Sequence, residues 1–230
     1  MTSIVKITSP LPETPYAPFW DISIGVSQWD DIKKIDIIRN WLINNEINIK
    51  NKYPAVHDGG TNLGLDSVTS RFSQYNLFNF INECPELEDL LNFLRKSWIE
   101  FVSQDRTPYI DLDIVCWFNL MHDTQQVAEH KHGAHPTAYL SGNMSLDNYH
   151  TSTLYRNSFS DSTYLSIKNT KGEITIFPTY VYHKSEEYKG GNTPRLTIAF
   201  DLHIHEVNDG VKKIPFMTKS IFDQLVPQND

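Results

Sequence analysis

Near residue 107 the spacing of the apolar side chains changes from steps of three and four residues to steps of two. The segment 194–206, PRLTIAFDLHIHE, shows the second pattern most clearly. Its apolar alternate positions are Leu196, Ile198, Phe200, Leu202 and Ile204. Because successive side chains of a strand point to opposite faces, we expect a half-buried strand here, with Arg195 and Thr197 on its polar face.

Other short strands are predicted after residue 107 by the same alternation. They lie at 109–120, 135–146, 163–169 and 172–178. Connections this short suit antiparallel pairing. The stretch 147–162 is rich in hydroxyl and aromatic side chains, and we interpret it as a loop, either a lid over a site or a plain surface connection.

Two segments before residue 107 have the helical spacing. In 28–47, apolar residues recur at steps of three and four, and Asp30 or Asp31 can cap the start. The segment 85–102 begins with Pro85 and has acidic residues in its first turn. Helices followed by a run of strands predict a single α+β domain over 230 residues, in which the helices cover a β-sandwich or barrel.

Charge and cysteine content exclude several classes of protein. The net charge is −8, the pI is near 5.5, and no run of Lys or Arg offers a surface for nucleic acid or an anionic membrane. Cys84 and Cys116 lie outside any disulfide or zinc-finger spacing, which fits a reducing compartment. No window reaches about eighteen apolar residues, and the N-terminus lacks the apolar core of a signal peptide. We therefore expect a soluble, cytoplasmic protein.

Histidines gather in AEHKHGAHPTAYLSG, residues 128–142. His130 and His132 alternate with Lys131, so on a strand both imidazoles face one side and can share a metal ion. A third ligand has to come from elsewhere, and His183, after the strand 172–178, is the best candidate. His135 offers an alternative, because HKHGAH is similar to the His-x-His-x-Asp-His run of metallo-β-lactamase-type hydrolases, although Ala134 stands at the Asp position.

Six motifs follow one another in the second half of the chain. They are WFN at 117–119, HKH at 130–132, LSG at 140–142, GEITIFP at 172–178, His183, and RLTIAFD at 195–201. Their order resembles that of a bacterial and phage group of Fe(II)- and 2-oxoglutarate-dependent oxygenases. The resemblance implies a double-stranded β-helix (jelly-roll) core over 107–206, preceded by a mainly helical part over 1–106 and followed by a C-terminal extension over 207–230.

The resemblance also implies roles for individual residues. Fe(II) would be held by His130, His132 and His183. The distal carboxylate of 2-oxoglutarate would be bound by the planar fork of Arg195 and the hydroxyl of Thr197. Two further residues, Asn119 and Ser141, would contribute hydrogen bonds at the co-substrate site. The implied activity is a dioxygenase that uses O2 to hydroxylate an unidentified small molecule or peptide and releases succinate and CO2, with no nucleic-acid or membrane partner.

The chain departs from the usual pattern of that superfamily at two points, and this leaves alternatives open. His132 stands where a carboxylate ligand is usual, and the stretch from His132 to Ser141 is three residues longer than expected. Counting back from LSG would select His135 as the second ligand. A zinc hydrolase or lyase with three histidines is the second hypothesis, and a non-catalytic jelly-roll binding protein is the third. Exposed strand edges would allow a homodimer.

Overall fold

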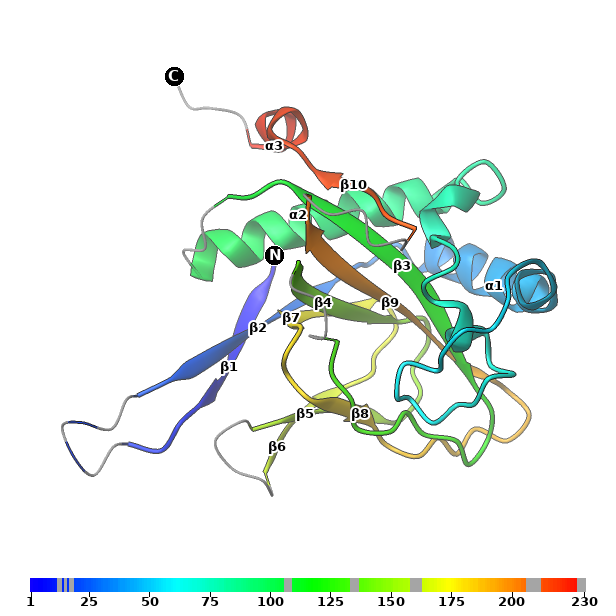
Figure 1. The fold of residues 1–230 in the computed structure, drawn as a ribbon, viewed down its shortest axis with the longest axis horizontal. Helices are drawn as coiled ribbons and strands as arrows, with labels where there is room; N and C mark the ends of the chain where they lie inside the picture. Colours follow the sequence, from blue (N-terminus) through cyan, green and yellow to red (C-terminus); the bar gives the residue numbers. More distant parts are fainter. Residues whose placement is uncertain are drawn as a thin grey trace.

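The computed structural model describes residues 1–11, 14, 16, 19–105, 109–132, 137–157, 163–205 and 212–226. Two antiparallel sheets form its centre, a seven-stranded major sheet of order β1-β2-β7-β4-β9-β3-β10 and a three-stranded minor sheet of order β6-β5-β8 (Figure 1). The strands are β1 (Ser3–Thr8), β2 (Asp21–Gln28), β3 (Leu112–Met121), β4 (Ala138–Ser145), β5 (Ser152–Arg156), β6 (Tyr164–Lys168), β7 (Glu173–Pro178), β8 (His183–Ser185), β9 (Arg195–Ile204) and β10 (Ile214–Met217). The prediction of an α+β fold is confirmed.

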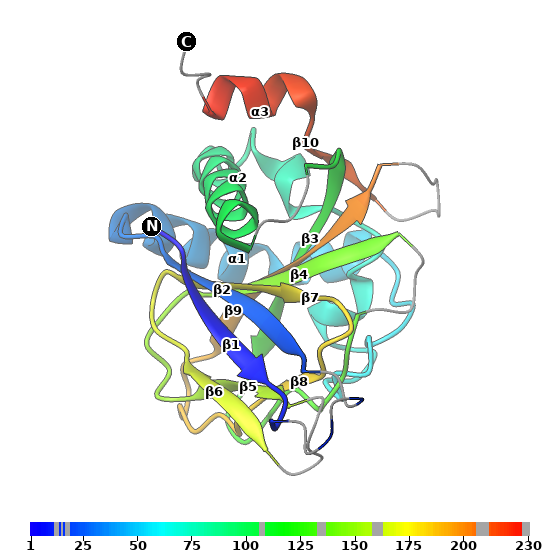
Figure 2. The ribbon, with the colours of Figure 1, turned by 90° about the vertical axis from the view of Figure 1, so that its left-hand side faces the viewer.

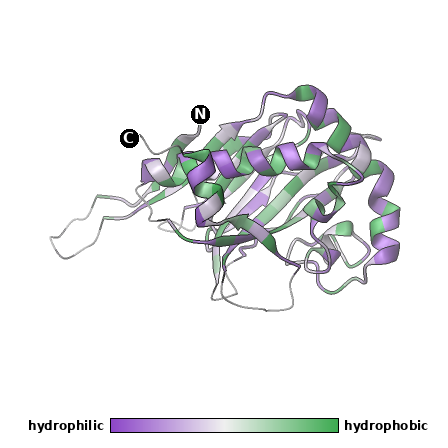
Figure 3. Cartoon of the chain, turned by 90° about the horizontal axis from the view of Figure 1, so that it is seen from above, coloured by the Kyte–Doolittle hydropathy of each residue, from purple (hydrophilic) through white to green (hydrophobic). Residues whose placement is uncertain are grey.

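Two long helices cover the major sheet on the side away from the minor sheet, so that the molecule has three layers (Figure 2). The helical elements are α1 (Ile32–Lys52), η1 (Val68–Arg71), η2 (Leu77–Phe80), α2 (Glu86–Asp105) and α3 (Lys219–Leu225). Asp31 caps α1 by accepting a hydrogen bond from the Lys34 amide at 3.2 Å. Hydrophilic and hydrophobic residues alternate along the helices, as expected where only one face is buried (Figure 3). Among the described residues, no helix has the length and apolar character needed to cross a membrane.

The alternation in β9 separates a packing face from a polar face. Leu196, Ile198, Phe200 and Leu202 are buried in one apolar cluster with residues of α1 and α2. Since neighbouring side chains point the opposite way, Arg195 and Thr197 face the space between the two sheets. The apolar face of this strand thus anchors the helices, and its polar face is left for the interior between the sheets.

Three strands lie where the sequence analysis predicted helix or loop. Strands β1 and β2 belong to the mainly helical part, yet they form a hairpin that extends the major sheet through pairing of β2 with β7. Strand β5 lies within 147–162, which we interpreted as a loop, and it is the central strand of the minor sheet. These strands make the two-sheet architecture more extensive than the alternation after residue 107 indicated.

Gly142 lies in β4 at a point where the sheet has no room for a side chain. A Cβ atom there would lie 2.2 Å from Phe200 Cζ and 2.6 Å from the Thr175 carbonyl oxygen. We expect Gly142→Ala to lower the free energy of unfolding by about 1–3 kcal/mol, because neighbouring atoms must move. Urea denaturation measures this change, with Gly64→Asn as the control, since Gly64 has a φ of +84° and nothing within 4 Å of the added Cβ. An equal loss of unfolding free energy in Gly142→Ala and Gly64→Asn would show that crowding at Gly142 is not the cause.

Candidate metal centre

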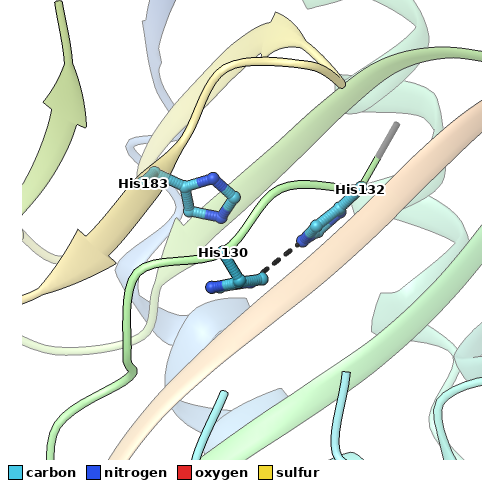
Figure 4. Close-up of side chains that lie close together, drawn as sticks. All are labelled: His130, His132 and His183. Carbon is cyan, nitrogen blue, oxygen red and sulfur yellow. Dashed lines mark hydrogen bonds between the residues drawn. The ribbon is translucent and has the colours of Figure 1, made fainter. Parts of the chain in front are cut away.

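Three histidines meet between the two sheets. The side chains of His130, His132 and His183 each offer one ring nitrogen, and these nitrogens lie within 4.8 Å of one another (Figure 4). His130 and His183 are fixed by paired backbone hydrogen bonds, 3.0 Å from His130 N to His183 O and 2.9 Å in the opposite direction. The His132 amide donates to the Thr179 carbonyl at 3.0 Å. Within the part of the chain that the structure describes, this histidine cluster (His130, His132 and His183) is the only group of three with ligand spacing.

The outer nitrogen of each ring has a hydrogen-bond acceptor. His130 Nδ1 lies 2.8 Å from the Ala128 carbonyl oxygen, and His183 Nδ1 lies 3.1 Å from the Val181 carbonyl oxygen. A carbonyl can only accept, so each Nδ1 carries the proton and each Nε2 presents a lone pair. Nε2 of His130 lies 3.1 Å from Nε2 of His132, a separation that suits two nitrogens facing one ion.

His132 differs from the other two histidines in its outer partner. Its Nδ1 lies 2.6 Å from Asp201 Oδ1, and Ser141 Oγ donates to the same carboxylate oxygen at 2.6 Å. The three groups form one hydrogen-bonded network, in which Ser141 of β4 is paired with Asp201 of the neighbouring strand β9. The pKa of Asp201 lies below its ordinary value: burial opposes ionisation, but the charge and hydrogen bond of His132 and the Ser141 hydroxyl outweigh it.

Burial keeps the imidazoles of His130 and His183 in the form that binds metals. It lowers the pKa of His130 to about 4, with neighbouring His132 adding to the effect. Burial, followed by the proximity of the other two histidines, places the pKa of His183 well below its ordinary value. Both rings are therefore neutral at neutral pH, and no proton has to be displaced before they can ligate.

A cavity of about 470 Å³ contains the histidine cluster and extends along β3 and β9. The predicted site residues Asn119, Arg195 and Thr197 line it together with the three histidines. Its apolar wall includes Phe72, Val115, Trp117, Val127 and Ala199. The cavity thus combines a few polar groups with a largely apolar surround, as is usual for small-molecule sites.

Arg195 is a buried cation with no counterion among the described residues. It is 2% exposed, and within the same part of the chain its Nε has no hydrogen-bond partner and its Nη1 donates only to Met121 Sδ, at 3.7 Å. No carboxylate among the described residues forms an ion pair with it, although its guanidinium lies 5.8 Å from the centre of the Tyr149 ring. Burial lowers the pKa of Arg195 to about 10, which leaves it charged at neutral pH. A buried charge of this kind is costly unless it is paired, so its position on the cavity wall favours binding of an anion.

The other predicted co-substrate residues divide into two positions. Asn119 Nδ2 donates to Thr197 Oγ1 at 3.4 Å, and Thr69 Oγ1 donates to Asn119 Oδ1 at 2.8 Å. This chain of hydrogen bonds lies beside Arg195, because Asn119 pairs with Thr197 and Met121 with Arg195 along the β3–β9 ladder. Ser141 lies elsewhere: it is fully buried behind His132 and is not among the residues that line the cavity.

Several residues of the site were not predicted from the sequence. Asp201 stood on the polar face of the 194–206 strand, but its partners are 60 and 69 residues away in the chain. Thr69 also lines the cavity, and nothing in its local sequence indicated it. The glycine-rich segment 57–67, HDGGTNLGLDS, in contrast predicts a loop at the border of the pocket, and its residues His57 and Thr61 line the cavity. The alternative ligand His135 lies outside the described residues.

Comparison with known proteins identifies the fold. A scan of protein-family profiles and a search of curated proteins gave no match. Among solved structures, a Pseudomonas putida prolyl-4-hydroxylase matches with a TM-score of 0.50 and 11% identity, covering 79% of this chain and 93% of that one. The non-heme monooxygenase ThoJ matches with a TM-score of 0.51 and 8% identity, covering 84% of this chain and 79% of that one. SnoK, an alpha-ketoglutarate-dependent carbocyclase from nogalamycin biosynthesis, matches with a TM-score of 0.50 and 8% identity, covering 79% of each chain.

These neighbours share the arrangement of sheets that the motifs predicted. The chain has the fold of the 2-oxoglutarate-Fe(II) oxygenase structures, with a jelly-roll core, and that prediction is confirmed. At 8–11% identity the likeness concerns the fold. The chemistry has to be argued from the side chains of this chain.

Proposed function

We propose that this chain, which has the fold of the 2-oxoglutarate-dependent oxygenases, is itself a dioxygenase that uses Fe(II), 2-oxoglutarate and O2. The metal would be held by His130, His132 and His183, and 2-oxoglutarate by Arg195 and Thr197. The products would be succinate, CO2 and a hydroxylated small molecule or peptide. The observation that carries the proposal is the buried Arg195, which has no counterion among the described residues, in the same cavity as the three histidines.

The residues present fit both groups. Three Nε2 lone pairs suit a divalent ion, and a site with three protein ligands leaves positions free for a chelating co-substrate and O2. The Arg195 guanidinium can bind a carboxylate through two parallel hydrogen bonds, which would satisfy the Nε that has no partner. When bound, the iron would supply activation of O2 and the oxidation of 2-oxoglutarate and substrate.

The remaining roles belong to the chain itself. Thr197 can donate its hydroxyl hydrogen to the same carboxylate that Arg195 binds, while the Asn119 amide holds Thr197 from the side. The apolar wall formed by Trp117, Val127 and Phe72 excludes water from the space beside the histidine cluster. The chain therefore orients the co-substrate between a fixed cation and the metal ligands and keeps the reacting groups dry.

The test is an anaerobic titration of the metal-free protein with Fe(II) and then 2-oxoglutarate. We expect a visible metal-to-ligand charge-transfer band when 2-oxoglutarate chelates the iron, and formation of succinate after O2 is admitted. The same titration with Zn(II) is the control and should give no band. If Fe(II) gives no band while Zn(II) binds tightly, the zinc hydrolase hypothesis would replace this one, because three histidines suit zinc equally well.

A further inference from the structure

We infer that Asp201 acts as a positioning residue that supplies negative charge to the metal centre through His132. This inference rests on the proposed function. Asp201 does not itself belong to the group of ligand atoms, which among the described residues contains only the three histidines. Its influence on the metal would pass through one imidazole ring, whose Nδ1 faces the carboxylate and whose Nε2 faces the other histidines.

The first step of the argument is the charge of the ligands. An imidazole carries no charge when it binds a metal, so three histidine ligands leave the full charge of a divalent ion uncompensated inside a largely apolar cavity, where unpaired charge is costly. Asp201 is the one carboxylate hydrogen-bonded to the histidine cluster among the described residues. It lines the same cavity.

The second step is the state of the Asp201 carboxylate. Its side chain is 14% exposed, and its one recorded ion pair among the described residues is with His132, at 2.6 Å. No Lys or Arg of the described residues neutralises it, so its charge remains available to the ring that it contacts. A short, charge-assisted hydrogen bond of this kind raises the basicity of the ligand nitrogen across the ring.

The third step is the contrast between the three rings. Backbone carbonyls accept the Nδ1 protons of His130 and His183, and a carbonyl carries only a partial charge. His132 alone has an anionic acceptor, which Ser141 fixes by donating to the same oxygen at 2.6 Å. The His132–Asp201 pair therefore provides the metal centre with one nitrogen donor and the charge of one carboxylate, and His130 and His183 provide the other two nitrogen donors.

The decisive variant is Asp201→Asn, which removes the charge and keeps the shape. The asparagine Oδ1 can still accept hydrogen bonds from both His132 Nδ1 and the Ser141 hydroxyl. We expect the dissociation constant for Co(II), measured by optical titration without 2-oxoglutarate, to rise by about 10–100-fold. In the Fe(II) and 2-oxoglutarate complex the charge-transfer band should move to shorter wavelength, because a less electron-rich iron holds its electrons more tightly.

Two further variants make the result specific. Ser141→Ala removes one hydrogen bond to Asp201 but keeps the charge, so its effect on both readouts should be clearly smaller. If Asp201→Asn does not fold, the double variant His132→Asp with Asp201→Asn returns one carboxylate to the site, and it should bind Co(II) within about 10-fold of the parent protein. Loss of Co(II) binding in that folded double variant would overturn the inference.

The outcomes separate this inference from the proposed function. Absence of metal binding or of the charge-transfer band in the unaltered protein would defeat the proposed function, and this inference with it. A normal band and affinity in the unaltered protein, with the same values in folded Asp201→Asn, would overturn the role of Asp201 alone. Equal losses in Asp201→Asn and Ser141→Ala would assign the effect to hydrogen bonding rather than charge and would also overturn it.

Discussion

Replacing Arg195 with methionine should weaken the binding of 2-oxoglutarate by at least about 100-fold, because the distal carboxylate would lose its buried ion-pair partner. Met has a similar volume to the arginine stem and leaves the histidine cluster unchanged. The titration of the charge-transfer band with 2-oxoglutarate measures this loss, and the Fe(II) content at saturation should stay the same. Arg95→Met is the matched control: Arg95 lies on α2, where its Nε donates to the Phe216 carbonyl at 2.7 Å, and it is not among the residues that line the cavity.

The same variant should be more stable than the unaltered protein when no co-substrate is present. Arg195 is 2% exposed and without a counterion among the described residues, so its burial opposes folding. Removal of that cost should raise the free energy of unfolding by about 1 kcal/mol or more, which is about 2–4 °C in Tm for a domain of this size. Thermal unfolding of the metal-free protein measures it. If Arg195→Met unfolds at a lower temperature and binds 2-oxoglutarate normally, Arg195 has a structural role and the co-substrate assignment is wrong.

This opposition between stability and binding is typical of a pre-organised site. On the proposed function, the ligand that neutralises Arg195 binds after the protein has folded. Saturating 2-oxoglutarate should then raise the free energy of unfolding of the unaltered protein and of Arg95→Met more than that of Arg195→Met. The Asn119 and Thr197 side chains are likewise held by each other before any ligand binds. Binding energy is therefore not consumed in ordering these groups.

The part of the fold that the sequence predicted is the part in which local pattern and burial agree. In β9 every second residue is apolar, and burial of that face against the helices directs Arg195 and Thr197 into the cavity. The helix predicted over 28–47 begins at Ile32 after its Asp31 cap and continues to Lys52. For such segments the period of the apolar residues reports the buried face directly.

The missed strands are stabilised mainly by contacts that are distant in the sequence. Strand β5 reads STLYR, with only alternate residues buried, and it becomes a strand because β6 and β8 supply hydrogen bonds on both sides. Strand β2 reads DISIGVSQ and pairs with β7, which lies about 150 residues later in the chain. A short segment of mixed polarity does not reveal such a partner.

In the candidate site, too, the local sequence does not reveal partners that are distant in the chain. Alternation predicted that His130 and His132 act together, and the structure brings them to His183. The supporting positions of Ser141 and Asp201 depend on the register of β4 against β9, which no local pattern specifies. The assignment of Ser141 to the co-substrate stays a prediction, and in the structure its hydroxyl lies 3.1 Å from His132 Nδ1 and donates to Asp201 Oδ1 at 2.6 Å.

Replacing His132 with alanine should abolish metal binding under conditions in which the unaltered protein is saturated, a loss of more than about 100-fold in affinity. Two histidines would remain, and the Asp201 carboxylate would lose the ring that links it to the metal. Metal content after Fe(II) or Co(II) loading and gel filtration measures the effect. His205→Ala is the matched control, because His205 is an exposed histidine whose Nδ1 contacts Asp113 at 2.8 Å and which does not line the cavity.

His135→Ala decides between the two ways of counting the motif. We expect His135→Ala to keep its metal, since the ring nitrogens of His130, His132 and His183 already lie within 4.8 Å of one another. The ring of His132 also has both of its nitrogens engaged in the manner of a ligand, with Nδ1 on a carboxylate and Nε2 beside His130 Nε2. Loss of metal in His135→Ala with retention in His132→Ala would transfer the second ligand to His135 and remove the basis for the role of Asp201. Loss in both variants would indicate four histidine ligands, a coordination that leaves fewer positions for 2-oxoglutarate and O2 and favours zinc.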